Sequence, residues 1–415
     1  MSPDAERPSS DHTRRRFLTG ASAALATSLS AATAGCLSGL PPLGSGQRYG
    51  RLRAPQAGAP TYRRWLPAPS TVEQFPGAYH FTVLGDDAGR TDAPALVALR
   101  RAHVEAATDY FGVGFAAYDR IVTTPFGSVI EAEFDRGAVR DALSRTRYAP
   151  DGGRGGYDLF ARDDVPRRVA VGDDVLVWTS AYHHEAPNLD ALVEAGAGER
   201  RRYHEVNRPF ERLTAAAGDS PYVGANVEIR DPTGAPALLA DSFRFGEDAA
   251  YQLVQYRYTD RTPTAEELEA ALRTHDYRFA DEASAFDVEI DGALATVAAR
   301  VPYADRDGPA ARYDYPQVTW GVDRDAAANA VTFRHEGGDA VPAERLFYDV
   351  GRPEAPGGIR KRPLWQGAGT VDAGSTATVD LSDVDEPTDV SLVYATEEVA
   401  FHVLFGVDLW GESDG

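Results

Sequence analysis

Two stretches of the chain share the order strand, helix, hairpin, and this repeat constrains the fold more than any other feature. In the first stretch, strand 129–134 is followed by a helix and then by the hairpin 168–180. In the second, strand 251–258 is followed by a helix and then by the hairpin 286–301. A doubly wound parallel sheet needs strict strand–helix alternation, which this order does not give. We therefore expect an α+β fold of duplicated β-α-β-β units in a mainly antiparallel sheet with helices on one face.

Helix boundaries in this region are marked by capping residues. Four side chains of the N-cap type precede stretches with helical spacing of apolar residues: Asp92, Asp135, Asn188 and Asn207. Thr264 and Glu267 have the spacing of a capping box. These signals place the helices of an α+β domain over 61–302, either as one unit or as two repeats, 61–218 and 219–302.

After residue 302 the pattern changes to short strands separated by turns, with no clear helix. The expected strands lie at sandwich spacing, at 317–322, 331–335, 346–350, 369–371, 376–381, 390–394 and 401–409. We therefore expect 303–415 to form an all-β, immunoglobulin-like sandwich.

The N-terminal segment has the features of an export signal. Arg14, Arg15 and Arg16 precede a mild Ala/Ser-rich apolar run, and Thr33-Ala34-Gly35-Cys36 follows. Residues 1–35 resemble a twin-arginine (Tat) signal peptide, and the last four residues resemble a lipobox, with Thr33 departing from the usual bulky aliphatic residue. The resemblance implies lipidation of Cys36 and a place on the outer face of the cytoplasmic membrane. The alternative is a plain Tat substrate in which Cys36 is incidental.

Cys36 is the only cysteine, so the chain cannot form an internal disulfide or a cysteine metal site. The following residues, 36–60, are rich in Gly and Pro, and their lack of periodicity predicts a tether.

The charge balance restricts the partners of the protein. The chain has 63 acidic and 42 basic residues, a formal net charge of −21, and Lys361 is its single lysine. This excess argues against nucleic acid and anionic lipid as partners, because both are polyanions. An acidic, nearly lysine-free chain resembles the proteins of halophilic archaea, in which concentrated salt screens repulsion between acidic side chains.

Two segments resemble known families. Residues 167–218, RRVAVGDDVLVWTSAYHHEAPNLDALVEAGAGERRRYHEVNRPFERLTAAAG, resemble a group of exported bacterial and archaeal proteins of unknown function. Residues 331–348, VTFRHEGGDAVPAERLFY, with Trp365 and the stretch VDAGSTATV at 371–379, resemble the β domain of archaeal type IV pilin-like proteins. Pilins polymerise through an N-terminal hydrophobic helix. A Tat lipobox stands there instead, so the resemblance implies a sandwich module and not a filament subunit.

The strongest metal-like cluster combines His183, His184 and Glu185 with His204. His and Glu are ligands for zinc or iron, although no HExxH spacing is present and consecutive loop residues point in different directions. A polar loop end is the alternative interpretation. His103 and His335 are expected to be structural, at a helix–core boundary and in a turn. We find no G-x-S-x-G or P-loop motif and expect no cofactor.

These observations favour a non-enzymatic, lipid-anchored surface protein with a binding, adhesion or envelope-scaffold role. Its partners would be the membrane, through a lipid on Cys36, and other envelope proteins; its ligand is unknown. A solute-binding lipoprotein of a transporter is the first alternative. A metal-dependent hydrolase that uses His183, His184 and His204 is the second.

Overall fold

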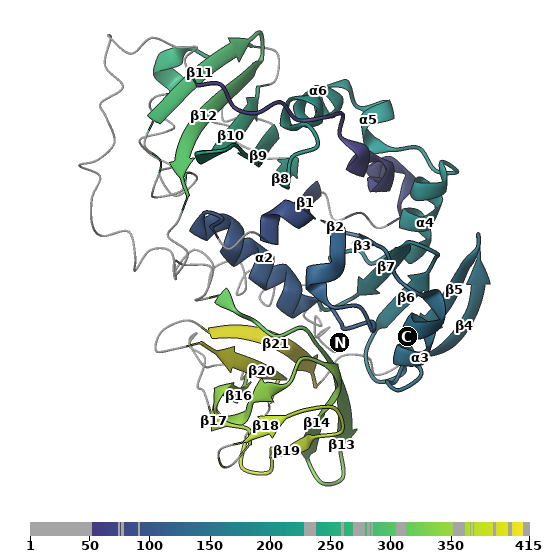
Figure 1. Ribbon diagram of the computed structural model, residues 1–415. Coiled ribbons are helices and arrows are strands. Elements are labelled where there is room, and N and C mark those ends of the chain that lie inside the picture. The colour runs from purple at the N-terminus through teal and green to yellow at the C-terminus, as the bar shows by residue number, and fades with distance from the viewer. Residues whose placement is uncertain are drawn as a thin grey trace, which may run out of the picture.

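The computed structural model describes two β-rich parts packed against each other (Figure 1). The signal segment, Cys36 and the first part of the expected tether lie outside the described residues, as does part of the second expected helix. The described residues are 52–73, 75, 79–89, 92–227, 238–258, 261–268, 279, 283, 285–303, 313–351, 362–365, 367, 369–384, 387–396 and 401–409.

The larger part is built on one twelve-stranded sheet. From one edge to the other, its strands are β11 (Ala285–Asp291), β12 (Leu294–Pro302), β10 (Ala249–Arg257), β9 (Leu238–Phe245), β8 (Tyr222–Val227), β1 (Tyr79–Gly85), β2 (Tyr118–Thr124), β3 (Gly127–Ala132), β7 (Val175–Ser180), β6 (Arg167–Val171), β5 (Tyr157–Ala161) and β4 (Ala149–Arg154). Every pairing in it is antiparallel, including the central pair β1–β8. The expected mainly antiparallel α+β architecture is therefore confirmed.

Helices cover both faces of this sheet, which corrects the expectation of helices on one face. One face packs against α4 (Leu189–Ala197), α5 (Tyr203–Val206), α6 (Arg208–Ala217) and the 3₁₀ turn η2 (Thr61–Trp65). The other face packs against α2 (Ala95–Ala107) and α3 (Arg136–Leu143).

Both faces of the sheet are covered because its inner strands, such as β7, are apolar on both sides. All six residues of β7 are buried, with Val177 in one core and Leu176 and Trp178 in the other. A strand buried on both faces needs a helical layer on each side. Among the described helices, none is long and apolar enough to cross a bilayer.

Most of the predicted caps are present. The side chains of Asp135, Asn188 and Asn207 each accept a hydrogen bond from the backbone N–H three residues on. The prediction for Asp92 is wrong, because α2 begins after Pro94, which has no side-chain cap. Pro94 occupies the N-cap position, where its missing N–H costs no helical hydrogen bond.

The smaller part consists of short antiparallel sheets around one core. One sheet contains β13 (Val318–Asp325), β14 (Ala330–Gly338) and β19 (Thr376–Asp380). A second sheet contains β17 (Arg362–Pro363), β16 (Leu346–Val350), β20 (Asp389–Ala395) and β21 (Phe401–Asp408). A third consists of β15 (Val341–Pro342) and β18 (Thr370–Val371), and the 3₁₀ turn η8 (Ala343–Arg345) precedes β16. Trp320 and Phe333 of the first sheet share a hydrophobic core with Phe405 of the second.

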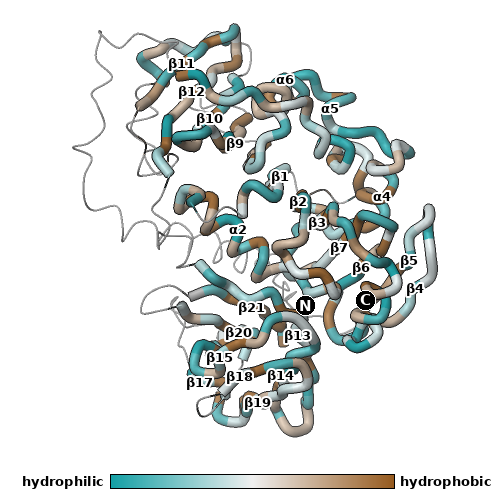
Figure 2. The backbone as a smooth tube through the Cα atoms, in the orientation of Figure 1, coloured by the Kyte–Doolittle hydropathy of each residue, from teal (hydrophilic) through white to brown (hydrophobic). Residues whose placement is uncertain are grey.

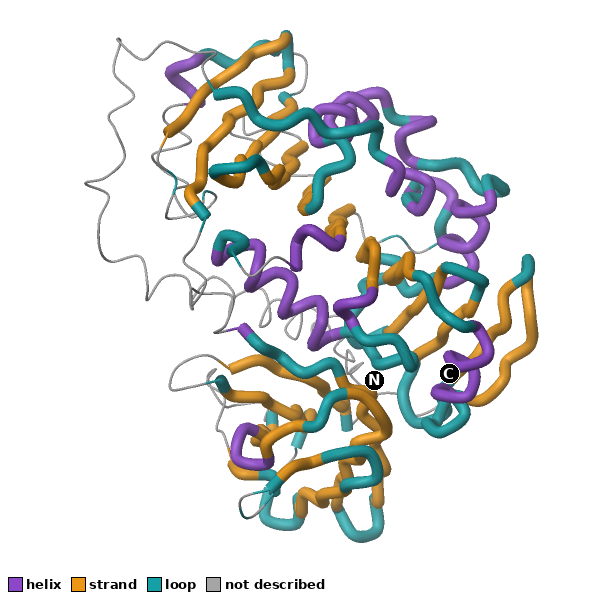
Figure 3. Tube along the Cα trace, viewed as in Figure 1, coloured by secondary structure: helices purple, strands orange, loops and turns teal. Residues whose placement is uncertain are grey.

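Helix α2 lies between the two parts (Figures 1 and 3). Its Val97 belongs to the core beneath the large sheet, whereas Ala102 and Ala106 belong to the core of the small β part. Hydrophobic and hydrophilic residues both occur along it (Figure 2). The two parts therefore share a helix as well as a surface.

The last part of the expected tether is held against the large sheet. The Arg244 Nη1 donates to the Pro55 carbonyl (3.1 Å), and the backbone N–H of Asp219 donates to the Gly58 carbonyl (3.0 Å). The N–H of Leu52 donates to Asp287 of β11 (3.3 Å). Residues 52–60 of the expected tether therefore lie against the folded part, where their backbone groups contact β9, β11 and the loop between α6 and β8.

Candidate functional site

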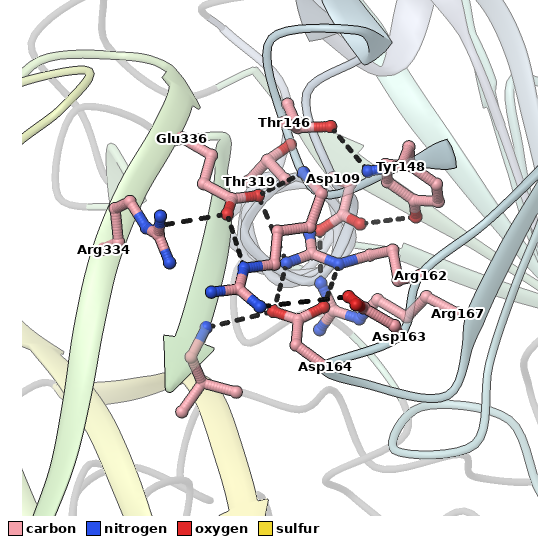
Figure 4. Close-up of polar contacts among 12 residues, drawn as sticks. Asp109, Thr146, Tyr148, Arg162, Asp163, Asp164, Arg167, Thr319, Arg334 and Glu336 are labelled. Carbon is pink, nitrogen blue, oxygen red and sulfur yellow. Dashed lines mark hydrogen bonds and ion pairs between the residues drawn. The ribbon is translucent and has the colours of Figure 1, made fainter. Parts of the chain in front are cut away.

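The junction between the two parts concentrates the buried charges of the molecule (Figure 4). We call the following six residues the junction network: Arg147, Arg162, Asp164, Asp323, Arg334 and Glu336. The first three come from loops around β4 and β5, and the last three from β13 and β14. The network therefore joins the large sheet to the small β part.

Arg162 is the centre of this network. Its guanidinium donates through Nε and Nη2 to the two oxygens of Asp164 (2.8 and 2.7 Å), and its Nη2 lies 3.2 Å from Glu336. These three side chains are 0%, 3% and 3% exposed. Because buried ion pairs are weakly screened by salt, this contact holds the two parts together over a wide range of ionic strength.

The two carboxylates of this centre respond differently to burial. Burial alone would raise the pKa of Asp164, but the hydrogen bonds from Arg162 lower it below its usual value. Burial raises the pKa of Glu336 above its usual value, and Arg162 offsets this only in part. Of Asp164 and Glu336, Glu336 is thus the carboxylate that protonates more readily.

A second buried ion pair lies beside the first. Arg167 at the start of β6 pairs with Asp109, and the two side chains are 2% and 1% exposed. Asp109 also accepts from the Tyr148 hydroxyl (2.8 Å). The Arg167 guanidinium lies over the rings of Phe405 in β21 (4.8 Å) and Trp178 in β7 (5.6 Å), so this cation contacts both parts of the molecule.

Two histidines stack at the same junction. The rings of His103 on α2 and His402 on β21 are 4.7 Å apart and nearly parallel, and Tyr315 stacks on both, 5.7 Å from His103 and 5.0 Å from His402. Burial lowers the pKa of His103 to about 4 and that of His402 to about 3. Both rings are therefore neutral at pH 7. His103 lies at a helix–core boundary, as the sequence predicts.

The stack of His103 and His402 makes the free energy of unfolding depend on pH. Between the unfolded histidine pKa of about 6.5 and the lowered folded values, the unfolded chain binds protons that the folded chain does not. The free energy of unfolding should therefore fall as the pH falls from about 6.5 to about 4. In His402→Phe, which keeps an aromatic ring, we expect this fall to be smaller by about 1–3 kcal/mol. Chemical denaturation at a series of pH values measures it.

Glu105 on α2 changes the pH dependence of stability in the opposite direction. Burial raises its pKa to about 7, so the folded chain holds a proton there that the unfolded chain releases. Its contribution to stability rises as the pH falls from about 7 to about 4.5. Glu105 is present in both the wild type and His402→Phe, so their difference isolates the histidine. Identical pH profiles for the two proteins would contradict the prediction.

The structure does not bring the four predicted metal ligands together. The His183 Nε2 is 3.3 Å from Arg167, and the exposed Glu185 is 3.8 Å from His80 on β1. His204 lies on α5, on the other face of the sheet. No group of three metal-ligating side chains occurs in the described part of the chain. Within the described residues the four candidate ligands do not meet, because neighbouring loop residues diverge and His204 belongs to a different layer.

His184 makes a contact that sequence reasoning missed. Its Nε2 is 3.2 Å from Ser128 Oγ, and its Nδ1 is 3.0 Å from the backbone N of Ser180. Burial lowers its pKa to about 3. Ser128 and His184 are 2% and 3% exposed, which keeps a substrate from reaching this serine. We assign the contact a structural role, in packing the end of β7.

His335 has the structural role that the sequence predicts. Its Nε2 is 2.7 Å from the Asp339 carbonyl, across the turn that follows β14. Its backbone N–H donates to the Ser375 carbonyl (3.0 Å) before β19.

An open hollow lies next to the junction network. Its volume is about 490 Å³, and its lining is Arg147, Ala149, Pro150, Asp151, Ala161, Arg162 and Asp163. No sequence motif marks these residues. The one available signal is the density of Arg and Asp in the segment 145–168, which the general acidity of the chain conceals.

Comparisons with known proteins give little guidance. No protein-family model matches the chain, and no curated protein matches it. Among solved structures, crystal form III of TP0453 is 8% identical, with a TM-score of 0.35, covering 59% of this chain and 96% of that one. Crystal form I of TP0453 is 7% identical, with the same TM-score, covering 60% and 94%. Similarity at this level carries no argument about function.

Proposed function

We propose that this protein is an exported, lipid-anchored surface protein of a halophilic archaeon with a non-enzymatic binding, adhesion or envelope-scaffold role. The observation that carries the proposal is the junction, where Arg162, Asp164 and Glu336 are paired and buried between the two parts. Separating the parts would expose partly compensated charges and the cation–π contact of Arg167 with Phe405. Two parts joined rigidly by buried ion pairs suit a scaffold protein, because a scaffold presents its binding surfaces in a fixed arrangement.

The same observation weighs against a solute-binding lipoprotein that closes like a hinge. Such proteins bind their solute in a cleft between two lobes that open and close. Here the space between the parts is filled by ion pairs, by the ring stack of His103 and His402, and by α2. A solute-binding role would have to use an open hollow on the surface and not a cleft that closes between the two parts.

The metal hydrolase remains the weaker alternative, because His183, His184 and His204 do not face one centre in the described structure. Elemental analysis of the purified protein tests it: about one zinc, iron or manganese ion per chain would favour it, and substoichiometric metal would remove it.

The anchor and the export route can be tested together. Mass spectrometry of the protein from native membranes, extracted gently in concentrated salt, reports the N-terminus and the mass of any group on Cys36. We expect a chain that begins at Cys36 and carries lipid. A soluble chain with an unmodified Cys36 would contradict the anchored role.

The halophilic origin gives a separate prediction. With a net charge of −21, the folded chain repels itself most when the Debye length is long, about 30 Å at 0.01 M salt, and little at about 3 Å in 1 M salt. We expect the thermal unfolding midpoint to fall steeply as KCl is diluted. Circular dichroism melts over a KCl series measure this, and a midpoint independent of KCl would contradict it.

We also propose that the large sheet arose by duplication. The strands on one side of the centre run β1, β2, β3, β7, β6, and those on the other side run β8, β9, β10, β12, β11. In both halves, a hairpin after a helix returns its second strand to the third strand of the unit. Strands β4 and β5 extend the first half only. For the small part, the core shared by two sheets supports an immunoglobulin-like, pilin-like sandwich.

A further inference from the structure

We propose that the open hollow beside the junction network binds a small zwitterion of the α-amino acid class, with Arg147 as the receptor for its carboxylate and Asp163 as the receptor for its ammonium group. This inference names a ligand for the binding role above. It does not depend on export or on a lipid at Cys36, which a different measurement tests.

Arg147 has donors left for a carboxylate. Its Nη2 pairs with Asp323 of β13, which fixes one edge of the guanidinium. Its Nη1 is 3.9 Å from Asp163, and its Nε is 3.9 Å from Glu336, both beyond hydrogen-bond distance. The side chain is 29% exposed and lines the hollow. A ligand carboxylate could therefore accept a charge-assisted hydrogen bond from Arg147 without displacing Asp323.

Arg162 adds positive charge behind this position. It also lines the hollow, its side chain is fully buried, and its Nη1 has no hydrogen-bond partner among the described residues. A buried guanidinium donor without a partner is costly, so nearby negative charge or an ordered water would be stabilised there. The two arginines therefore make one end of the hollow favourable for a carboxylate.

Asp163 supplies the opposite charge. Its side chain is 84% exposed, and among the described residues it forms a loose ion pair with Arg147, at 3.9 Å. Asp151, the other carboxylate of the lining, is engaged by Arg168 at 2.7 Å. Asp163 is thus the carboxylate that an incoming ammonium group can approach with the least competition.

The charge balance of the lining favours a zwitterion over a simple anion. Two arginines and two aspartates line the hollow, so the charges of the lining residues sum to zero and both signs are present on its wall. A ligand with both charges, separated by a short spacer, matches the separated charges of the wall. The remaining lining, Ala149, Pro150 and Ala161, is apolar and can contact a ligand side chain. The volume of about 490 Å³ lies within the usual range for small-molecule sites.

Isothermal titration of the full chain in concentrated KCl tests the proposal. The probes are L-leucine, with acetate and isobutylamine as ligands that carry one charge each. We expect leucine to bind and each single-charge probe to bind at least about tenfold more weakly. Absence of leucine binding at up to about 10 mM would overturn the proposal, as would equal binding of acetate.

Three variants locate the binding. Arg147→Gln and Asp163→Asn should each weaken leucine binding about tenfold or more. Arg154→Gln, on the same hairpin but paired with Asp190 and Glu194 outside the hollow, is the matched control and should bind as the wild type does. Asp163→Asn changes an exposed side chain, so its fold should be intact by circular dichroism. Wild-type binding by both hollow variants would overturn the assignment.

Discussion

Arg167→Met is expected to lower the free energy of unfolding by about 3–5 kcal/mol, because it leaves the Asp109 carboxylate buried without its cation. The Tyr148 hydroxyl would still donate to Asp109, but a neutral hydroxyl compensates a buried charge poorly. The change also removes the cation over Phe405 and Trp178. Chemical denaturation followed by tryptophan fluorescence measures the loss.

The double variant Arg167→Met with Asp109→Leu separates charge from packing. It removes both members of the pair, so no uncompensated charge remains, and we expect it to recover most of the stability lost in Arg167→Met. A further control, Arg168→Gln, breaks the exposed pair with Asp151 and should cost less than about 1 kcal/mol. A double variant no more stable than Arg167→Met would show that packing, and not the unpaired charge, dominates.

Trp320→Ala should destabilise the small β part by about 3–5 kcal/mol. Trp320 is 1% exposed in the core between its two sheets, and its ring centroid lies 5.2 Å from that of His335 and 6.2 Å from that of Trp365. Removing the indole leaves a cavity that short strands cannot close. Hydrogen exchange followed by mass spectrometry shows where protection is lost, and denaturation gives the size of the effect.

The prediction for Trp320→Ala is tested by where in the chain protection from hydrogen exchange is lost. We expect exchange to increase in β13, β14 and β20 more than in β1 and β8, since the latter pair lies in the large sheet. Tyr348→Ala, at a half-buried position on β16, is the matched control and should cost much less. Equal deprotection of both parts would show that they unfold as one cooperative unit and would contradict the local effect.

Local signals in the sequence predicted local structure well. The hairpin 168–180 appears as β6 and β7, and the caps at Asp135, Asn188 and Asn207 hold, because each depends on a few neighbouring residues. The second helical layer was missed. The continuous apolar run of β7 indicates burial on both faces, but nothing local shows which helices provide it.

The junction could not have been predicted in the same way. Arg162 and Glu336 belong to different parts of the molecule, and their pairing exists only once both parts are folded. In a chain with 63 acidic residues, the few carboxylates that become buried look like all the others. His183 illustrates this: the sequence makes it a candidate metal ligand, yet its ring nitrogen lies 3.3 Å from Arg167 in the folded chain.

The central pairing of β1 with β8 has a consequence for how the chain folds. β1 is made early, but one of its two edges stays open until β8 has been synthesised, after all of α2 to α6. Closing such a long loop carries an entropic penalty that slows folding, and until then β1 offers a free edge to other chains. We therefore expect the first half alone to aggregate, and expect the sheet to become a stable unit only after the second half has joined it.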